Sequence, residues 1–267
     1  MGVEIVIPAL MFRTPSGDFD PFATQRYAHR AARTWIDRFI LSGSTTRGDL
    51  LSVAERAAIL DLWVAAVEPS RLVACCWCDE DMRLAGQRGI RPIVVMRGLE
   101  THHQALAFFA QLPAGAYVYS HPRHTPITVD GTLASAATEE GILPGGAKLA
   151  KAGLDDIAAV RDVAGPGFTL WDGSSRHIRA SIRSGASGVV ATPLADLPMP
   201  FPARSITAIQ AVTDEAQRKL DRHATRRTRL NCLLRSASRG STAPPPAPPG
   251  EVRQARRRSD TVNGPDP

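Results

Sequence analysis

The chain has 267 residues, 43% of them hydrophobic, and is long enough for one large α/β domain or two small ones. No apolar run approaches the roughly 18 residues of a membrane span, and Glu4 interrupts any signal-like start, so we expect a soluble, cytoplasmic protein that engages no membrane. The net charge of +6 is weak evidence for a nucleic-acid partner, because residues 214–267 hold 12 basic and 6 acidic residues whereas residues 1–213 hold 20 of each. We therefore expect no nucleic-acid partner, with binding through the basic tail as the alternative.

Eight short apolar runs of strand character follow one another along the chain. They cover residues 3–10, 39–42, 72–76, 92–96, 116–119, 146–148, 168–171 and 188–191. Segments with helical periodicity lie between them, for example residues 22–36, 53–67, 101–112, 154–163 and 176–184. This alternation predicts a parallel sheet whose outer face is covered by helices.

Eight β-α units in about 210 residues fit a closed (β/α)8 barrel, also called a TIM barrel. An open, doubly wound sheet is the main alternative. It would usually place a Gly-rich phosphate loop after the first strand, where this chain reads Phe12-Arg13-Thr14-Pro15. Ser52-Val53-Ala54-Glu55 matches a capping box at the start of the second helix, which makes Glu55 a structural residue.

Strand signals stop after about residue 202. Residues 205–234 are typical of one or two Arg-rich helices, and residues 243–250 form a Pro-rich tract. We therefore assign residues 1–222 to the barrel, residues 223–238 to a shortened C-terminal helix and residues 239–267 to a disordered tail.

The four cysteines do not form a disulfide framework, because Cys75, Cys76 and Cys78 crowd together and Cys232 lies far away. A zinc site would need a second pair of ligands at suitable spacing, and His102 and His103 are adjacent. We expect buried, reduced thiols on a strand, and no metal or cofactor.

Lys148 is the first candidate for chemistry. The chain holds only three lysines, and Lys148 alone follows a strand-like run of small residues, at the end of the sixth strand. Active sites of (β/α)8 barrels lie at the carboxyl ends of the strands. An amine there is partly removed from water, which favours the neutral form that attacks a carbonyl carbon. A surface lysine is the alternative interpretation.

Several segments, in order and spacing, resemble the dihydrodipicolinate synthase and N-acetylneuraminate lyase family. Gly43-Ser44-Thr45, followed by Glu55-Arg56, is similar to the family's Gly-Thr-Thr or Gly-Ser-Thr loop with its trailing Glu-Arg pair, and Tyr119-Ser120-His121-Pro122 is similar to its Tyr-Asn-x-Pro segment. Lys148 falls where the family's lysine falls. Trp171-Asp172-Gly173-Ser174 and the segment 185–190, which ends at Val190, resemble the family's signatures on strands seven and eight.

The resemblance implies a (β/α)8 barrel that acts as a Schiff-base-forming aldolase or lyase on pyruvate or a related 2-oxo acid, with or without an aldehyde as second substrate. In that family the lysine, here Lys148, forms the imine, and the tyrosine, here Tyr119, relays protons. The resemblance further places Gly43, Ser44, Thr45, Arg123, Gly173 and Val190 at the substrate. It implies no cofactor and allows a homo-oligomer.

Two departures from the family pattern leave a second interpretation open. Family members commonly present a tyrosine after the fourth strand to complete the proton relay, and this chain has Met96-Arg97-Gly98-Leu99 there. The arginine that binds the second substrate in the synthases is displaced by one position, to Arg123. The alternative is therefore a catalytically impaired barrel with a binding or regulatory role.

Overall fold

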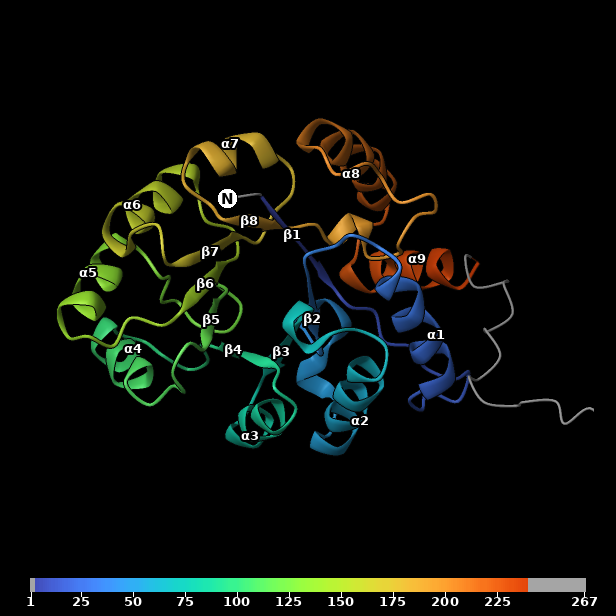
Figure 1. Ribbon diagram of the computed structural model, residues 1–267, viewed down its shortest axis with the longest axis horizontal. Helices are drawn as coiled ribbons and strands as arrows, with labels where there is room; N and C mark the ends of the chain where they lie inside the picture. Colours follow the sequence, from blue (N-terminus) through green and yellow to red (C-terminus); the bar gives the residue numbers. More distant parts are fainter. Residues whose placement is uncertain (1–2, 240–267) are drawn as a thin grey trace, which may run out of the picture.

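The computed structural model describes residues 3–239, and its eight strands close into a barrel (Figure 1). The strands are β1 (Glu4–Pro8), β2 (Arg38–Leu41), β3 (Leu72–Cys76), β4 (Arg91–Val95), β5 (Tyr117–Ser120), β6 (Gly146–Leu149), β7 (Thr169–Asp172) and β8 (Gly188–Val190). Each pairs in parallel with its neighbours, and β8 pairs with β1. The predicted fold is confirmed, and each strand lies within a residue or two of its apolar run.

Seven helices surround the barrel. They are α1 (Pro21–Ala32), α2 (Val53–Val64), α3 (Asp79–Gln87), α4 (His102–Phe109), α5 (Gly131–Glu139), α6 (Leu154–Ala164) and α7 (Ile178–Arg183). The capping box at α2 is confirmed, since the Ser52 hydroxyl accepts from the Glu55 amide at 3.1 Å and the Glu55 carboxylate accepts from the Ser52 amide at 2.8 Å. Glu55 is thus held at the helix start.

Strand alternation divides the apolar side chains into an interior cluster and an outer layer under the helices. The interior cluster consists of Val6, Ile40, Val73, Cys75, Trp77, Ile93, Val95, Tyr117, Tyr119, Trp171 and Val190. Side chains such as Phe39 and Leu170 point the other way, into the outer layer. Because the interior is filled, space for a ligand remains only at its ends.

Two more helices follow the barrel, and the first runs in the same direction as the strands. Helix α8 (Ile206–Asp221) begins beside the amino ends of the strands, where Arg204 pairs with Asp37 just before β2. It ends beside the carboxyl ends, where Asp221 pairs with Arg176 at 3.1 Å in the turn after β7. The chain therefore returns to the mouth of the barrel before its last described helix.

Helix α9 (Arg226–Arg239) starts at that mouth and descends beside α1 (Figure 1). The Arg226 guanidinium donates to the Ser44 carbonyl, and the Arg30 guanidinium of α1 donates to the Ala237 carbonyl at 2.7 Å. Arg239, expected to open the tail, is the last residue of α9. The rest of the predicted disordered tail lies outside the described residues.

The prediction of buried cysteines on a strand is confirmed for Cys75 and Cys76, which lie on β3, and wrong for Cys78, which is exposed. The strand ends at Cys76, and Cys78 instead precedes the first turn of α3. Burial raises the pKa of the Cys75 thiol to about 12, so this sulfur stays protonated and unreactive near neutral pH.

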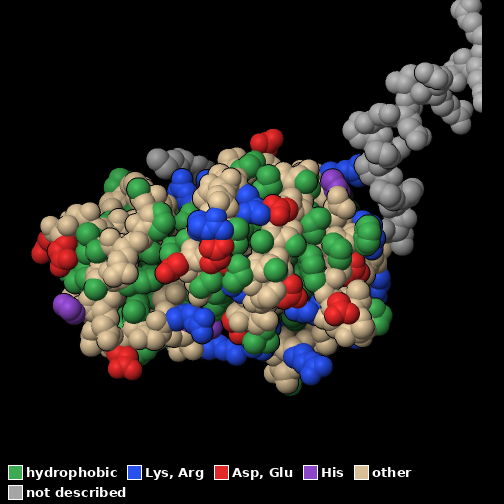
Figure 2. All heavy atoms as spheres, turned by 90° about the horizontal axis from the view of Figure 1, so that it is seen from below, with side chains coloured by type: hydrophobic (Ala, Val, Ile, Leu, Met, Phe, Trp, Pro, Cys, Tyr) green, Lys and Arg blue, Asp and Glu red, His purple; other side chains and the backbone are tan. Residues whose placement is uncertain are grey.

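The side of the barrel that carries α2 and α3 shows basic, acidic and apolar side chains intermixed (Figure 2). Arg88 at the end of α3, for example, pairs with Asp61 of α2 at 2.6 Å. This mixture agrees with the balanced charge of residues 1–213. Among residues 3–239, no helix is both long and apolar enough to cross a membrane.

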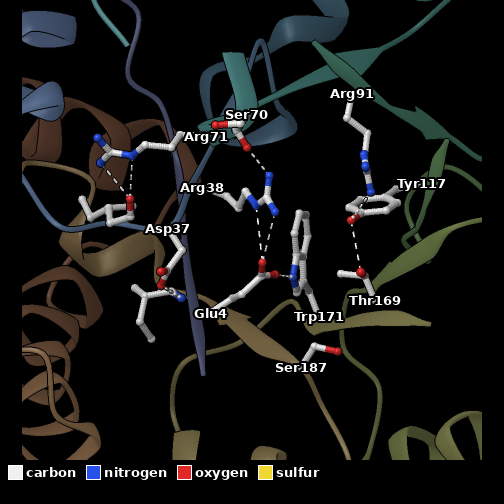
Figure 3. A network of polar contacts seen from close by, with 12 residues as sticks. Glu4, Asp37, Arg38, Ser70, Arg71, Arg91, Tyr117, Thr169, Trp171 and Ser187 are labelled. Atoms are coloured by element: carbon white, nitrogen blue, oxygen red, sulfur yellow. Dashed lines mark hydrogen bonds and ion pairs between the residues drawn. The ribbon is translucent and has the colours of Figure 1, made fainter. Parts of the chain in front are cut away.

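Polar side chains close the amino end of the barrel interior (Figure 3). Glu4, the first residue of β1, accepts from the indole Nε1 of the fully buried Trp171 at 2.7 Å. Its second oxygen accepts from Arg38 Nε at 3.4 Å. On the other side, the Tyr117 hydroxyl accepts from Arg91 at 2.7 Å and donates to Thr169 at 3.1 Å. Each of these groups therefore has a partner.

Candidate functional site

Lys148 and Tyr119 lie side by side inside the carboxyl half of the barrel. They are register partners on the neighbouring strands β6 and β5, so their side chains point to the same face of the sheet. The Lys148 Nζ atom is 4.0 Å from the centroid of the Tyr119 ring, within range of a cation–π interaction. Lys148 is 8% exposed and Tyr119 is 3% exposed. Both side chains are therefore buried at the mouth.

The Lys148 amine has no charged partner. Among residues 3–239, no carboxylate lies within ion-pair distance of Nζ. Buried lysines without a functional reason are rare, because an unpaired ammonium is costly to remove from water. A carbonyl compound that enters the mouth would therefore meet an amine that no protein anion holds.

The Tyr119 hydroxyl is hydrogen-bonded to the Ser44 hydroxyl at 2.9 Å, and either oxygen can donate. Ser44 opens the 3-10 turn Ser44–Thr46 that follows β2, with Gly43 as its N-cap residue. Ser44 is buried, whereas Thr45 is half-buried and lines a neighbouring cavity. The structure thus links Ser44, Tyr119 and Lys148 in one chain of contacts.

The loop after β2 has a compact shape. Arg47 adopts the left-handed conformation, with φ of 60°, and its guanidinium binds Asp49 at 3.1 Å. The Gly48 amide donates to the Gly43 carbonyl at 3.1 Å, and a Cβ atom at position 48 would lie 1.7 Å from the Ser42 carbonyl oxygen. Only glycine allows this close approach.

Two histidines that the sequence analysis did not place in the site flank Tyr119. The ring centroids of His121 and His124 lie 5.9 Å and 6.3 Å from that of Tyr119. The Arg123 amide donates to His121 Nδ1 at 2.9 Å, so a neutral His121 carries its proton on Nε2. His121 occupies the variable position of the Tyr119–Pro122 segment and His124 follows that segment by two residues, so neither belongs to the family motif.

Burial and neighbouring cations keep both rings neutral. Burial, then His124 and Lys148, lower the pKa of His121 to about 4. Burial, then Arg123, lowers the pKa of His124, whose Nε2 atom is buried without a hydrogen-bond partner among the described residues. At neutral pH the two imidazoles are therefore uncharged neighbours of the amine.

The remaining predicted site residues lie around this centre. Arg123 is exposed and lines the same cavity as Thr45. The Gly173 amide donates to the Leu149 carbonyl at 2.6 Å, and a Cβ at position 173 would lie 2.6 Å from that oxygen, so β7 can end close beside β6 only with glycine there. Val190 ends β8 and packs in the interior cluster.

The turn after β4 supplies no hydroxyl to the site. Met96 is fully buried, and the Arg97 guanidinium lies 5.8 Å from the Trp77 ring centroid. The Trp77 indole donates to the Ser42 carbonyl at 2.9 Å, which ties this side of the mouth to the loop after β2. The hydrogen-bonded hydroxyls of Ser44 and Tyr119 are therefore not joined by a tyrosine from the turn after β4.

Solved structures with the same fold are dihydrodipicolinate synthases and sugar-acid aldolases. The 2-keto-3-deoxygluconate aldolase of Picrophilus torridus aligns with a TM-score of 0.73 and 15% identity over 89% of this chain and 94% of that chain. The 4-hydroxy-tetrahydrodipicolinate synthase of Methylacidiphilum fumariolicum gives 0.66 and 16% over 89% and 96%. The dihydrodipicolinate synthase of Thermotoga maritima gives 0.64 and 14% over 89% and 80%.

No protein-family model matches the chain, and no curated protein sequence matches it. At these identities the structural matches establish the fold, and at that level they confirm the resemblance drawn from the sequence. The roles of individual residues rest on the geometry of the site.

Proposed function

We propose that this protein is a Schiff-base-dependent aldolase or lyase that acts on pyruvate or a related 2-oxo acid, with Lys148 as the nucleophile. The observation that carries the proposal is the buried Lys148 amine, which has no carboxylate partner within residues 3–239 and lies 4.0 Å from the Tyr119 ring. The fold shared with synthases and aldolases named for such chemistry supports it.

In the first step, the Lys148 lone pair adds to the ketone carbon of the 2-oxo acid. The carbinolamine then loses its oxygen as water and becomes a protonated imine. Tyr119 is the general acid that protonates the departing oxygen, and its hydrogen bond to Ser44 at 2.9 Å holds the phenol in position. The imine then draws electrons from the neighbouring carbon.

In the second step, the Tyr119 phenolate takes a proton from that carbon, and the resulting enamine attacks the carbonyl carbon of an aldehyde. The new alkoxide takes this proton from Tyr119, and water hydrolyses the protonated imine, which releases the product and the Lys148 amine and returns a proton to the phenolate. Cleavage is the same sequence in reverse. This chemistry needs no metal or cofactor.

The substrate carboxylate would lie at the loop after β2. The hydroxyls of Ser44 and Thr45, together with backbone amides that begin at Gly43, are the donors, because charge-assisted hydrogen bonds hold a carboxylate strongly. Gly173 and Val190 would form the opposite wall, and Arg123 would lie toward the second reactant.

The test is reductive trapping of the full chain. Each of a panel of 2-oxo acids is incubated with the protein, sodium borohydride is added, and the intact mass is measured. We expect wild type and Lys151→Arg, the control on the exposed neighbouring lysine, to gain one reduced substrate. Lys148→Arg should gain none, because a guanidinium stays protonated. Equal labelling of Lys148→Arg and wild type would contradict the assignment.

A second candidate is a barrel of this kind that binds a 2-oxo acid without turning it over, and the absent tyrosine after β4 favours it. Trapping and turnover distinguish the two. Imine formation without any aldol product across a panel of aldehydes would support the binding role, whereas product formation that depends on Lys148 supports the enzyme.

A further inference from the structure

We propose that the cavity between α9 and the loops after β1 and β2 binds the phosphate group of a phosphorylated reactant. This inference rests on the proposed function, because it names the second reactant of the same site as a phosphorylated aldehyde. The cavity has a volume of about 1100 Å³, which suits a small molecule.

The lining of this cavity is strongly basic. Seven arginines line it, and no aspartate or glutamate does. Arg13 and Arg47 already pair with carboxylates, Glu55 at 3.5 Å and Asp49 at 3.1 Å, and the charge of Asp49 also acts at longer range on Arg123 and Arg226. The other five have no ion-pair partner among residues 3–239, and they are Arg123, Arg226, Arg227, Arg235 and Arg239.

Such a concentration of exposed basic side chains attracts an anion. Helix α9 carries five arginines and no acidic residue, and Arg235 and Arg239 stand four residues apart, where like charges repel. The side of the barrel that carries α2 and α3 shows the opposite arrangement, with both signs interspersed (Figure 2). A ligand with two negative charges would relieve the repulsion in the cavity.

The cavity adjoins the proposed imine site. Arg226 donates to the backbone carbonyl of Ser44, and the Ser44 hydroxyl is hydrogen-bonded to Tyr119. Thr45, the next residue in the chain, lines the cavity. Burial, then the charge of Arg123, lowers the pKa of the Arg226 guanidinium, which shows how close the cations lie. A reactant that meets the enamine above Lys148 can therefore extend its far end into the cavity.

Phosphate suits this lining better than other anions. Arginine presents a planar fork that binds two phosphate oxygens at once. Arg123 and Arg226 lie close enough for the charge of one to act on the other, and two such forks favour a dianion over a single carboxylate. The apolar part of the wall, from Met11, Phe12, Leu230 and Leu234, would contact the carbon chain. Nucleic acid fits less well, because no aromatic side chains alternate with the arginines of α9 as base-stacking platforms.

The first experiment measures phosphate binding without the imine. Inorganic pyrophosphate is titrated by calorimetry, at fixed ionic strength, into the full-length Lys148→Arg protein. We expect saturable binding that weakens at least tenfold when Arg226→Gln or Arg235→Gln is added. Arg229→Gln, on the same helix but outside the cavity lining, should change affinity less than twofold. Absence of saturable binding, or equal weakening by all three substitutions, would overturn the proposal.

The second experiment links the cavity to catalysis. Condensation of pyruvate is compared for glycolaldehyde phosphate and glycolaldehyde, in wild type, in Arg226→Gln and in Arg235→Gln. We expect wild type to prefer the phosphorylated aldehyde in kcat/KM at least tenfold. We expect Arg226→Gln to lose that preference through KM, and Arg235→Gln, which has no contact with Ser44, to lose it while pyruvate trapping is unchanged. Pyrophosphate binding without trapping would reject the imine chemistry alone, whereas trapping without phosphate preference would reject this inference alone.

Discussion

The two ends of the barrel interior use polar residues in opposite ways. At the amino end, Glu4 satisfies Trp171 and Arg38, and the hydroxyl of Tyr117 has a donor and an acceptor (Figure 3). At the carboxyl end, the Lys148 amine faces a ring instead of a carboxylate. The polar groups at the amino end therefore satisfy one another, whereas under the proposed function the polar groups at the carboxyl end meet a ligand.

Two tyrosines on β5 make this comparison on a single strand. Tyr117 and Tyr119 both point into the interior, two residues apart. Tyr117 bonds Arg91 and Thr169 in the amino-end network, whereas within residues 3–239 the Tyr119 hydroxyl bonds Ser44 alone. The same substitution at both positions should therefore separate a structural hydroxyl from one that transfers protons.

The largest effect is expected from Tyr119→Phe. Imine trapping should persist, because Lys148 is untouched, but aldol turnover should fall by about 100-fold or more, the usual scale for loss of a general acid. Tyr117→Phe is the matched control, and we expect it to lower the melting temperature while turnover stays within about threefold. Turnover that survives in Tyr119→Phe would assign the proton to water or another side chain.

A smaller effect is expected from Glu4→Ala at the amino end. The substitution leaves the buried Trp171 indole without an acceptor and the Arg38 guanidinium without its carboxylate. An unsatisfied buried donor costs about 1–3 kcal/mol, which corresponds to a fall in melting temperature of about 2–10 °C for a domain of this size. Differential scanning calorimetry measures it.

The exposed Glu140→Ala, at the end of α5, is the control for that measurement and should not shift the transition. Imine trapping by Glu4→Ala at a temperature below the transition should equal that of wild type. Loss of trapping in the folded Glu4→Ala protein would mean that the two ends are coupled, and would contradict a purely structural role for the amino end.

Much of the barrel could be predicted from the sequence because each strand is a short apolar run. Lys148 could be placed at the end of β6 for the same reason, and the register then brings it beside Tyr119. The sequence could not show that α8 runs along the strands and returns the chain to the mouth, since that course is set by tertiary contacts such as the packing of Ile209 and Leu220 in the core. Arg226 was therefore missed as a neighbour of Ser44.

The two histidines were missed for a different reason. His121 and His124 stand in a loop, where no periodicity indicates the direction of a side chain, and only the fold brings their rings to Tyr119. Cys78 was assigned wrongly because the apolar run does not reveal that the strand ends at Cys76. In each case a turn, whose course is set by tertiary contacts, decides the position.

The smallest predicted effect is a pH dependence that only the carboxyl end should show. Burial and the nearby cations lower the pKa of His121 to about 4 in the folded protein, below its ordinary value of 6.5. The unfolded chain therefore binds a proton between these pH values that the folded chain does not, and stability falls as pH falls from 6.5 toward 4. Since His121 is only half-buried, solvent screening reduces the effect to about 1 kcal/mol, or about 2–4 °C in melting temperature.

The substitution His121→Gln removes this titration, and its amide oxygen can still accept from Arg123. Between pH 7.5 and pH 4.5 the melting temperature of the variant should therefore fall less than that of wild type, by about 2–4 °C. The exposed His29→Gln on α1 should track wild type at both pH values, and a difference as large in that control would place the acid sensitivity elsewhere in the molecule.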